Sequence, residues 1–167
     1  MKEYGIQFEK LTGDCILSAI IMSYFGPFTS EYRDDLKKKM ITKVHVDKIP
    51  YTINFEFCDF IVGVGAVQDW NMEGLPTDKF SKDNGVITKK ANRWPLMIDP
   101  QSQGLNWIKV NEKNEWRKAV TIADIKNPNY IKVIEDCIKK GKSCLMPDVG
   151  QELDPVLDNV LSKAYKQ

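Results

Sequence analysis

Two loops of this 167-residue chain have the position of a nucleotide site but lack its reactive residues. A phosphate-binding loop supplies glycines for close backbone approach, a lysine for the β- and γ-phosphates and a Ser/Thr hydroxyl for magnesium. The first loop fits that eight-residue spacing as Asp99, Pro100, Gln101, Ser102, Gln103, Gly104, Leu105 and Asn106. Asp99 stands where the first glycine belongs, and Leu105 and Asn106 replace the lysine and the hydroxyl residue. The sequence therefore predicts a degenerate phosphate loop with no catalytic residue.

The second loop follows an apolar run at residues 144–146 and begins with Pro147 and Asp148. In an ATPase, the corresponding strand ends in an acid that holds magnesium, followed by a glutamate that polarises water. No glutamate follows Asp148 directly, so we interpret Pro147 and Asp148 as a degenerate form of this acidic motif. An alternative is a compact P-loop-like nucleotide-binding enzyme that uses Asp148 for Mg²⁺. Leu105 argues against it, because losing the loop's positive charge typically costs several powers of ten in rate.

No other set of residues predicts chemistry in this chain. The only histidine, His45, lies in a lysine-rich stretch with no Cys or His at ligand spacing, so neither a metal site nor a Ser-His-Asp triad is expected. The four cysteines form no Cys-x-x-Cys pair, and we interpret them as small buried hydrophobic residues: Cys15, Cys58, Cys137 and Cys144. Residues 63–68 begin like a dinucleotide fingerprint, but Gln68 replaces its third small residue.

Strand and helix patterns alternate over the second half of the chain and place both loops after short strands. The predicted strands are 95–99, 119–122 and 143–146, and the predicted helices are 103–110, 128–140 and 155–164. Asn127 and Asp154 are predicted caps because each precedes a proline, and Gly141 is predicted to end the middle helix. This order is typical of a parallel sheet with right-handed crossovers, whose ligands bind beyond the carboxyl ends of the strands.

The first half of the chain is predicted to be largely helical. Residues 11–25 form a helix whose apolar stripe contains Leu11, Cys15, Ala19 and Met22. A second helix is expected over 30–40, with Ser30 as its cap and the lysines at 37–39 as its solvated C-terminal end. Periodicity leaves helix or strand open for residues 52–62. Glycines and a proline predict an irregular segment over 63–77, before a helix over 78–90 with Thr77 or Asp78 as its cap.

Composition excludes several classes of partner. The chain has 24 Lys+Arg against 23 Asp+Glu and a net charge of +1, so no nucleic-acid partner is implied. The longest apolar run, residues 15–28, has 14 residues, whereas a membrane span needs roughly 18 to 20. No membrane partner is therefore expected, and without a targeting segment a cytosolic setting is the default.

Four blocks of sequence form a specific signature, at residues 13–19 with 26–33, 69–71 with 74–78, 93–101 and 148–157. Together they resemble the dynein heavy chain, and specifically the fifth AAA+ module of its motor ring, which has no working nucleotide site. Residues 26–29 and 94–101 resemble axonemal heavy chains more than cytoplasmic ones, and residues 158–160 are closer to outer-arm types. Where the family's usual loop has a glycine, this chain has Ser102, and it also lacks the relict lysine at Asn106.

This resemblance implies a fold: a partial AAA+ α/β subdomain, built as a parallel three-layer sandwich and preceded by an α-helical segment. Residues 1–77 would be the stalk junction and the N-terminal segment of the module, and residues 78–167 the partial α/β subdomain. The helix at 11–25 would be the returning stalk helix as it enters the ring. In AAA+ sheets a fourth strand separates the strands that end here at Asp99 and Met146. We expect its absence to leave unpaired edges and to make the chain alone marginally stable or prone to aggregate.

The function implied by the resemblance is that of a non-catalytic coupling module, which transmits conformational change between the AAA+ ring and the microtubule-binding stalk. No cofactor is expected in this segment, since ATP and Mg²⁺ would bind in other modules of the parent ATPase. The implied partners are the other AAA+ modules and the stalk of the same heavy chain, and, through the parent, the microtubule and the dynein intermediate and light chains. The implied location is the cytoskeleton of a cilium or flagellum, in the axoneme. A third possibility is an α/β interaction module whose dynein-like motifs serve only folding.

Overall fold

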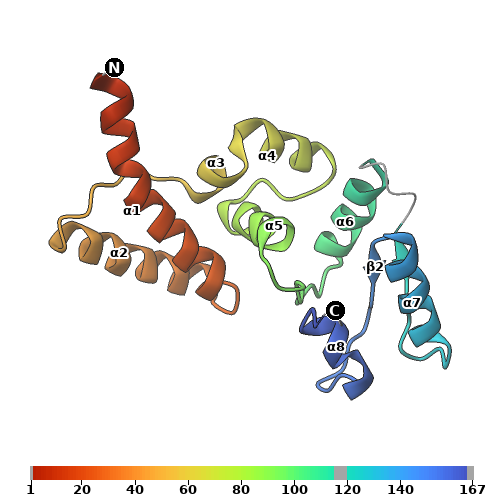
Figure 1. Cartoon of the computed structure of the whole chain (residues 1–167). Helices are drawn as coiled ribbons and strands as arrows, with labels where there is room; N and C mark the ends of the chain where they lie inside the picture. The colour runs from red at the N-terminus through yellow and green to blue at the C-terminus, as the bar shows by residue number, and fades with distance from the viewer. Residues whose placement is uncertain (1, 115–119, 165–167) are drawn as a thin grey trace. The chain divides into compact units, whose positions relative to one another are not determined.

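Helices make up most of the chain in a computed structural model that describes residues 2–114 and 120–164 (Figure 1). The chain divides into two compact units between Pro95 and Leu96. The first unit contains α1 (Lys2–Tyr24), α2 (Ser30–Val46), α3 (Phe57–Ile61), α4 (Gly63–Met72) and α5 (Lys79–Lys90). The second contains α6 (Gln103–Asn114), β1 (Thr121–Ile122), α7 (Tyr130–Lys140), β2 (Cys144–Leu145), a 3₁₀ turn η1 (Pro155–Leu157) and α8 (Asp158–Leu161).

The first unit is organised around the short helix α3, which packs against α1, α4 and α5. Phe57 of α3 is 1% exposed, and the side chains of Leu17 in α1 and Val86 in α5 are also fully buried. Gly85 allows α5 to come close, because a Cβ there would lie 3.0 Å from Leu75 Cδ2. A glycine that weakens a helix in isolation therefore serves packing in this unit.

The predicted helix at 11–25 is confirmed as part of α1, but its predicted buried stripe is wrong. Leu11, Cys15 and Ala19 are exposed, while the buried face repeats through Asp14, Leu17, Ser18, Ile21 and Phe25. Apolar residues occur around most of this helix, so periodicity alone could not select a face. Polar partners of Asp14, described below, determine which face is buried.

The helix α2 begins at Ser30 as predicted, but the N-cap residue is Thr29 and no side chain caps it. It continues to Val46, so the lysines at 37–39 lie in its middle and are not a helix end. Lys37 is held there by Glu56, at 3.8 Å between Lys37 Nζ and Glu56 Oε2. The last turn instead carries Lys43 and His45.

The region from 52 to 77 is more regular than predicted. Residues 57–61 are helical, which settles the helix-or-strand ambiguity, and the predicted irregular segment contains the ten-residue helix α4. Val67 and Trp70 on the inner face of α4 are buried and stabilise it against the glycines in its sequence. The next prediction is confirmed: Asp78 caps α5, accepting a hydrogen bond from the Ser81 N–H at 2.8 Å.

The second unit contains a parallel pair of strands, β1 and β2, in which Thr121 pairs with Cys144 and Ile122 with Leu145. The core of this unit is a cluster of Ala123, Tyr130, Ile134 and Leu157. Gly141 ends α7 with φ +61°, as predicted, and Asp154 caps η1 by accepting from the Val156 N–H at 3.0 Å. The parallel α/β element is thus present, whereas the described residues form a two-stranded sheet and not the predicted three-layer sandwich.

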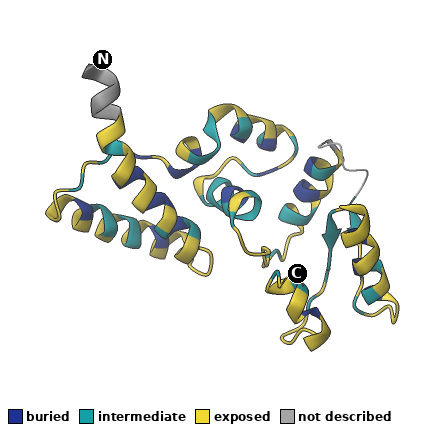
Figure 2. Ribbon diagram, viewed as in Figure 1, coloured by how far each residue is buried: buried dark blue, intermediate teal, exposed yellow. Residues whose placement is uncertain are grey.

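Three predicted boundaries in this unit are wrong. Residues 95–99 are extended but unpaired, with Leu96 78% and Ile98 94% exposed, because no strand of the described residues lies beside them. Figure 2 shows this link between α5 and α6 largely in the colour of exposed residues. The helix α7 begins at Tyr130 and not at 128, since Asn127 accepts from the Asn129 N–H in a turn. The final helix ends at Leu161.

Part of the predicted strand 119–122 lies outside the described residues, which resume at 120. No helix within the described part of the chain has the length and apolar character needed to cross a membrane.

Candidate functional site

The loop at residues 99–106, predicted to be a degenerate phosphate loop, is folded around the carboxylate of Asp99. Asp99 Oδ1 accepts a hydrogen bond from the Gln103 N–H at 3.0 Å, and Oδ2 accepts one from the Leu105 N–H at 2.9 Å. The Asp99 carbonyl also accepts from the Ser102 N–H at 3.1 Å, which closes the turn before α6. The first N–H groups of a helix have no partner within the helix and carry its partial positive charge, so they bind anions. Here the chain supplies that anion itself.

Two further residues shape this turn. Ser102, at the position where the family's loop has a glycine, adopts φ +57° in the left-handed region. A Cβ added at Gly104 would lie 3.4 Å from Asp99 Oδ2 and 3.5 Å from Met97 Sδ. The one glycine of the phosphate motif that this chain retains is therefore placed where the backbone passes close to the Asp99 carboxylate. It wraps a side chain where a phosphate-binding loop would wrap a phosphate.

The remaining loop residues add no positive charge. Leu105, at the lysine position, is half-buried, and Asn106 is exposed, as are Pro100 and Gln101. The helix is anchored behind the loop by Trp107 and Ile108, which are buried. Further along α6, Glu112 accepts a hydrogen bond from the Ser143 hydroxyl just before β2. The α6 helix is thus fixed to the sheet, with its N-terminus closed by Asp99.

The acidic motif after β2 is exposed. Asp148 adopts φ +53°, and its Oδ2 lies 3.6 Å from Lys126 Nζ, with both side chains 77% exposed. Among the described residues, Asp148 pairs with Lys126 and not with the Asp99 loop. No group of three or more His, Cys, Asp or Glu side chains in the described part of the chain is placed to hold a metal ion. The structure brings the loop residues together around Asp99, but leaves Pro147 and Asp148 separate from them.

The first unit contains a buried arginine that sequence analysis did not single out. Arg33 of α2 is 4% exposed. Its Nε donates to the Phe28 carbonyl at 3.0 Å, and its Nη2 donates to the Gly26 carbonyl at 3.1 Å and to Asn84 Oδ1 at 2.7 Å. Arg33 therefore joins the turn between α1 and α2 to α5. We call this set of contacts, together with the Phe80 contact described next, the Arg33 clamp.

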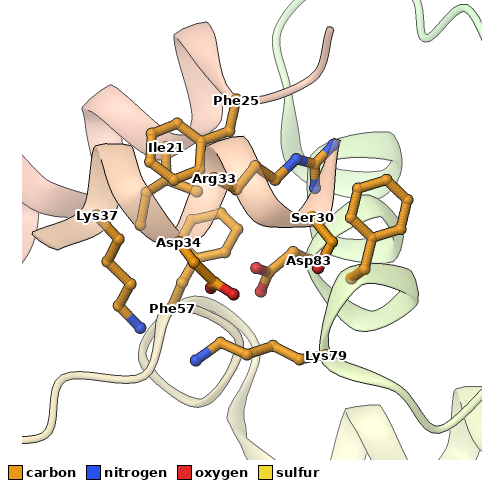
Figure 3. A pocket seen from close by; sticks show the side chains of 10 residues that line it. Ile21, Phe25, Ser30, Arg33, Asp34, Lys37, Phe57, Lys79 and Asp83 are labelled. Atoms are coloured by element: carbon orange, nitrogen blue, oxygen red, sulfur yellow. The ribbon is translucent and has the colours of Figure 1, made fainter. Parts of the chain in front are cut away.

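The guanidinium of Arg33 also lies over an aromatic ring, with Cζ 4.2 Å from the centroid of Phe80 on α5. Burial lowers the pKa of Arg33, while the nearby Asp83 carboxylate acts in the opposite direction. Its Nη1 is buried without a hydrogen-bond partner among the described residues. Beside it is a cavity of about 90 Å³ (Figure 3), which is polar enough and large enough to admit water. Its walls are Ile21, Phe25, Ser30, Arg33, Asp34, Lys37, Phe57, Lys79, Phe80 and Asp83.

The charged side chains around this cavity largely satisfy one another. Lys79 Nζ lies 2.9 Å from Glu56 Oε2, which Lys37 also approaches. The Cys58 thiol donates to Asp83 Oδ1 at 3.1 Å. Burial raises the pKa of the Asp83 carboxyl, and burial together with the Asp83 hydrogen bond raises that of the Cys58 thiol. A thiol with a raised pKa is a poor nucleophile, so this network is structural and not reactive.

A second polar contact fixes α1 to the loop that precedes α3. Asp14 accepts two hydrogen bonds from Thr52, from the backbone N–H at 2.8 Å and from the hydroxyl at 2.6 Å. The Ser18 hydroxyl donates to the Asp14 carbonyl at 2.8 Å. A Cβ at Gly13 would lie 2.2 Å from the Pro50 carbonyl oxygen, so only glycine lets the loop approach. We call this contact the Asp14 latch.

Sequence analysis noticed these segments without recognising the side chains that matter. The signature block at 13–19 contains both Gly13 and Asp14, and an acid beside a glycine on an apolar helix is a usable signal for a buried polar contact. Arg33 lies in a polar stretch of α2, where the sequence pattern does not show which of the charged side chains is buried. Its role depends on carbonyls and on an α5 side chain 51 positions away in the sequence.

Comparison with known proteins gives consistent matches. The family described as the ATP-binding dynein motor region matches residues 68–167. The chain is 42% identical, over 99% of its length, to the Dynein-1-beta heavy chain of the flagellar inner arm I1 complex from Chlamydomonas reinhardtii. It is 41% identical over 92% of its length to dynein axonemal heavy chain 2 from Mus musculus, and 36% identical over 97% to the dynein gamma chain of the flagellar outer arm from Chlamydomonas reinhardtii. The chain spans only 3 to 4% of the length of these relatives.

Proposed function

The chain belongs to the axonemal dynein heavy chain family, and from that premise we propose that it is a non-catalytic coupling module of the ATP-binding motor region. In this role it passes conformational change between the AAA+ ring and the microtubule-binding stalk, while ATP and Mg²⁺ bind in other modules of the heavy chain. The module would be the fifth of the ring.

The carrying observation is the Asp99 carboxylate at the N-terminus of α6. It accepts hydrogen bonds from the Gln103 and Leu105 N–H groups, which are the groups that a phosphate would need. A phosphate approaching this site would have to displace a covalently attached anion and would be repelled by its charge. Since Leu105 replaces the lysine, nothing in the loop offsets that repulsion.

The coupling part of the proposal is supported by α1. This 23-residue helix precedes the region matched by the motor-region family, which begins at residue 68. Its C-terminal half is fixed to the unit by the Asp14 latch, and the Arg33 clamp holds the turn that follows it. A stalk helix entering the ring needs such rigid attachment, because coupling is carried by rigid elements and packed polar networks.

The relatives are named as axonemal or flagellar chains, in agreement with the predicted location in a cilium or flagellum. Both an inner-arm and an outer-arm chain are among them, so an outer-arm type stays a prediction. The partners belong to the proposal: the other AAA+ modules and the stalk, the microtubule, and the intermediate and light chains of the complex.

Calorimetric titration of the monomeric chain with Mg-ATP tests the non-catalytic part. We expect no binding heat for the chain itself, and the same for Asp148→Asn. A variant with Asp99→Gly, Leu105→Lys and Asn106→Ser frees the helix N-terminus and restores the missing groups, so it serves as the positive comparison and is expected to bind measurably. Micromolar binding by the unchanged chain would refute the proposal. Loss of that binding in Asp148→Asn would favour the enzyme alternative.

A further inference from the structure

We propose that Arg33 is the positioning residue through which a displacement of α1 reaches α5. The inference rests on the proposed coupling function and adds a residue and a path to it. Arg33, a residue of α2 that lines the cavity in Figure 3, has contacts with the turn after α1 and with α5.

The first step concerns the turn after α1. Gly26 and Phe28 lie in the turn that connects α1 to α2, and the Arg33 side chain donates a hydrogen bond to the carbonyl of each. A guanidinium has five N–H donors in a planar, rigid fork, so these two bonds restrict the direction in which the turn leaves α1. The turn cannot shift without breaking bonds to a side chain that is 4% exposed.

The second step concerns α5. The same Nη2 that binds Gly26 also binds Asn84 Oδ1 at 2.7 Å, and the guanidinium lies over the Phe80 ring one turn earlier on α5. Hydrogen bonds to a charged group stabilise a fold more than most neutral ones do. The bond to Asn84 and the ring contact together therefore fix α5 to the turn.

The third step is that α1 is held at two places. The Asp14 latch and the Gly26 turn are 12 residues apart, about 18 Å along a helix at roughly 1.5 Å per residue. A helix held at both ends of such a span moves as a rigid rod. Tilting the N-terminal part of α1 would displace the residues of the Asp14 latch and of the Arg33 clamp together. Because the clamp also binds α5, that helix would be displaced with them.

The test uses the full heavy chain that contains this segment, with ATPase rates measured with and without microtubules. Arg33→Lys keeps the charge but not the fork, and Asn84→Ala removes only the α5 acceptor. Lys38→Gln, on the exposed side of α2, is the control. We expect a basal rate within about twofold of the parent for all three. Microtubule stimulation should fall about fivefold or more in Arg33→Lys, about twofold in Asn84→Ala and not at all in the control.

Each outcome decides the inference separately from the proposed function. Stimulation that stays intact in Arg33→Lys and Asn84→Ala would overturn it, while the non-catalytic proposal would still stand on the calorimetry. A parallel fall of basal and stimulated rates would also overturn it, because it would make the clamp a folding contact only. If Arg33→Lys does not fold, Asn84→Ala and Phe80→Leu decide, since both retain the arginine.

Discussion

The two units of the chain differ in the kind of contact that holds each of them together. In the first unit, Asp14, Ser18 and Arg33 are each at most 5% exposed, and each is hydrogen-bonded. In the second, the core is an apolar cluster of Ala123, Tyr130, Ile134 and Leu157, and Ile122 of β1 is 50% exposed. The first unit is joined by buried polar contacts, whereas the second is built on an apolar cluster and a two-stranded sheet.

The difference indicates that the two units meet different demands. In the proposed coupling role the first unit receives a stalk helix and therefore has to be rigid by itself. Buried charged hydrogen bonds provide that rigidity, at the risk of a large loss of stability when one partner is removed. A two-stranded sheet is marginally stable alone and needs further strands or helices against it. We therefore expect the second unit to depend on neighbouring parts of the heavy chain, and the first to depend on a few residues.

The largest difference between the two units is expected when one glycine in each is replaced by alanine. Gly13→Ala would place a Cβ 2.2 Å from the Pro50 carbonyl oxygen and separate the latch, so we expect a loss of about 3 kcal/mol in the stability of the first unit. Gly104→Ala meets Asp99 Oδ2 at 3.4 Å and gains helix propensity, so the change in the second unit should stay within about 1 kcal/mol. Hydrogen exchange of α1 and α6 measures both, and equal losses would contradict the comparison.

The next effect concerns two aspartates with the same capping chemistry. Asp99→Ala removes two acceptors at the N-terminus of α6 and should cost about 1–2 kcal/mol in local protection of α6. Asp78→Ala removes the bond from Ser81 at the start of α5 and should cost about 1 kcal/mol. Asp99→Asn retains an acceptor oxygen and is the control. If α6 is unchanged in Asp99→Ala, the carboxylate does not close the helix.

A smaller effect is expected from pH in the first unit. Burial raises the pKa of Asp83 above its ordinary value, so the folded state holds this proton more tightly than the unfolded state. Its contribution to stability is therefore complete below the unfolded pKa and is lost as pH rises through the folded pKa. The charged or titratable groups that influence it are Cys58, Lys79, Lys37 and Arg33.

The Asp83→Asn variant cannot ionise at this position, so it should not lose this contribution to stability. The free energy of unfolding of the variant minus that of the parent chain should therefore increase from about pH 4 to the raised pKa of Asp83 and then level off. Chemical denaturation followed at several pH values measures the difference. Asp34→Asn, in the wall of the same cavity but exposed, is the matched control and should show a smaller change. A difference that decreases with rising pH would reverse the assigned sign.

The smallest effect on stability is expected at the exposed link before α6. Replacing Leu96 and Ile98 by lysine should change stability by no more than about 0.5 kcal/mol, because both are largely exposed. We also expect the isolated chain to self-associate through this exposed, unpaired segment, and the two lysines to reduce that association. Val46→Lys changes an exposed apolar residue of the first unit and should not alter association. Light scattering at matched concentrations distinguishes the two sites.

Local signals predicted local structure well. Gly141 and Asp154 were assigned correctly as helix boundaries, and Asp78 was one of the two caps offered for α5, because a cap depends on residues within one turn of it. The caps predicted at Ser30 and Asn127 were each wrong by one or two residues. The buried face of α1, the existence of α4 and the absence of any strand at residues 95–99 were not predicted, although an unpaired sheet edge was expected there. Each depends on partners distant in sequence, and for residues 95–99 no strand among the described residues provides one.

The candidate site shows the same limit. Residue spacing predicts a degenerate phosphate loop from Asp99 to Asn106 that lacks the lysine, and this assignment stays a prediction. It did not predict that the Asp99 carboxylate turns back onto the Gln103 and Leu105 N–H groups. The Arg33 clamp was missed for a related reason, because its acceptors are backbone carbonyls and an amide on another helix.

Photoaffinity labelling of the full heavy chain with an azido-ATP analogue, followed by peptide mapping, tests the central claim most directly. The account predicts labelled peptides from other AAA+ modules and none that covers residues 97–106 or 143–149. Label in either of these segments that saturates with the analogue and is competed by ATP would show that the Asp99 loop binds nucleotide, and would contradict the account.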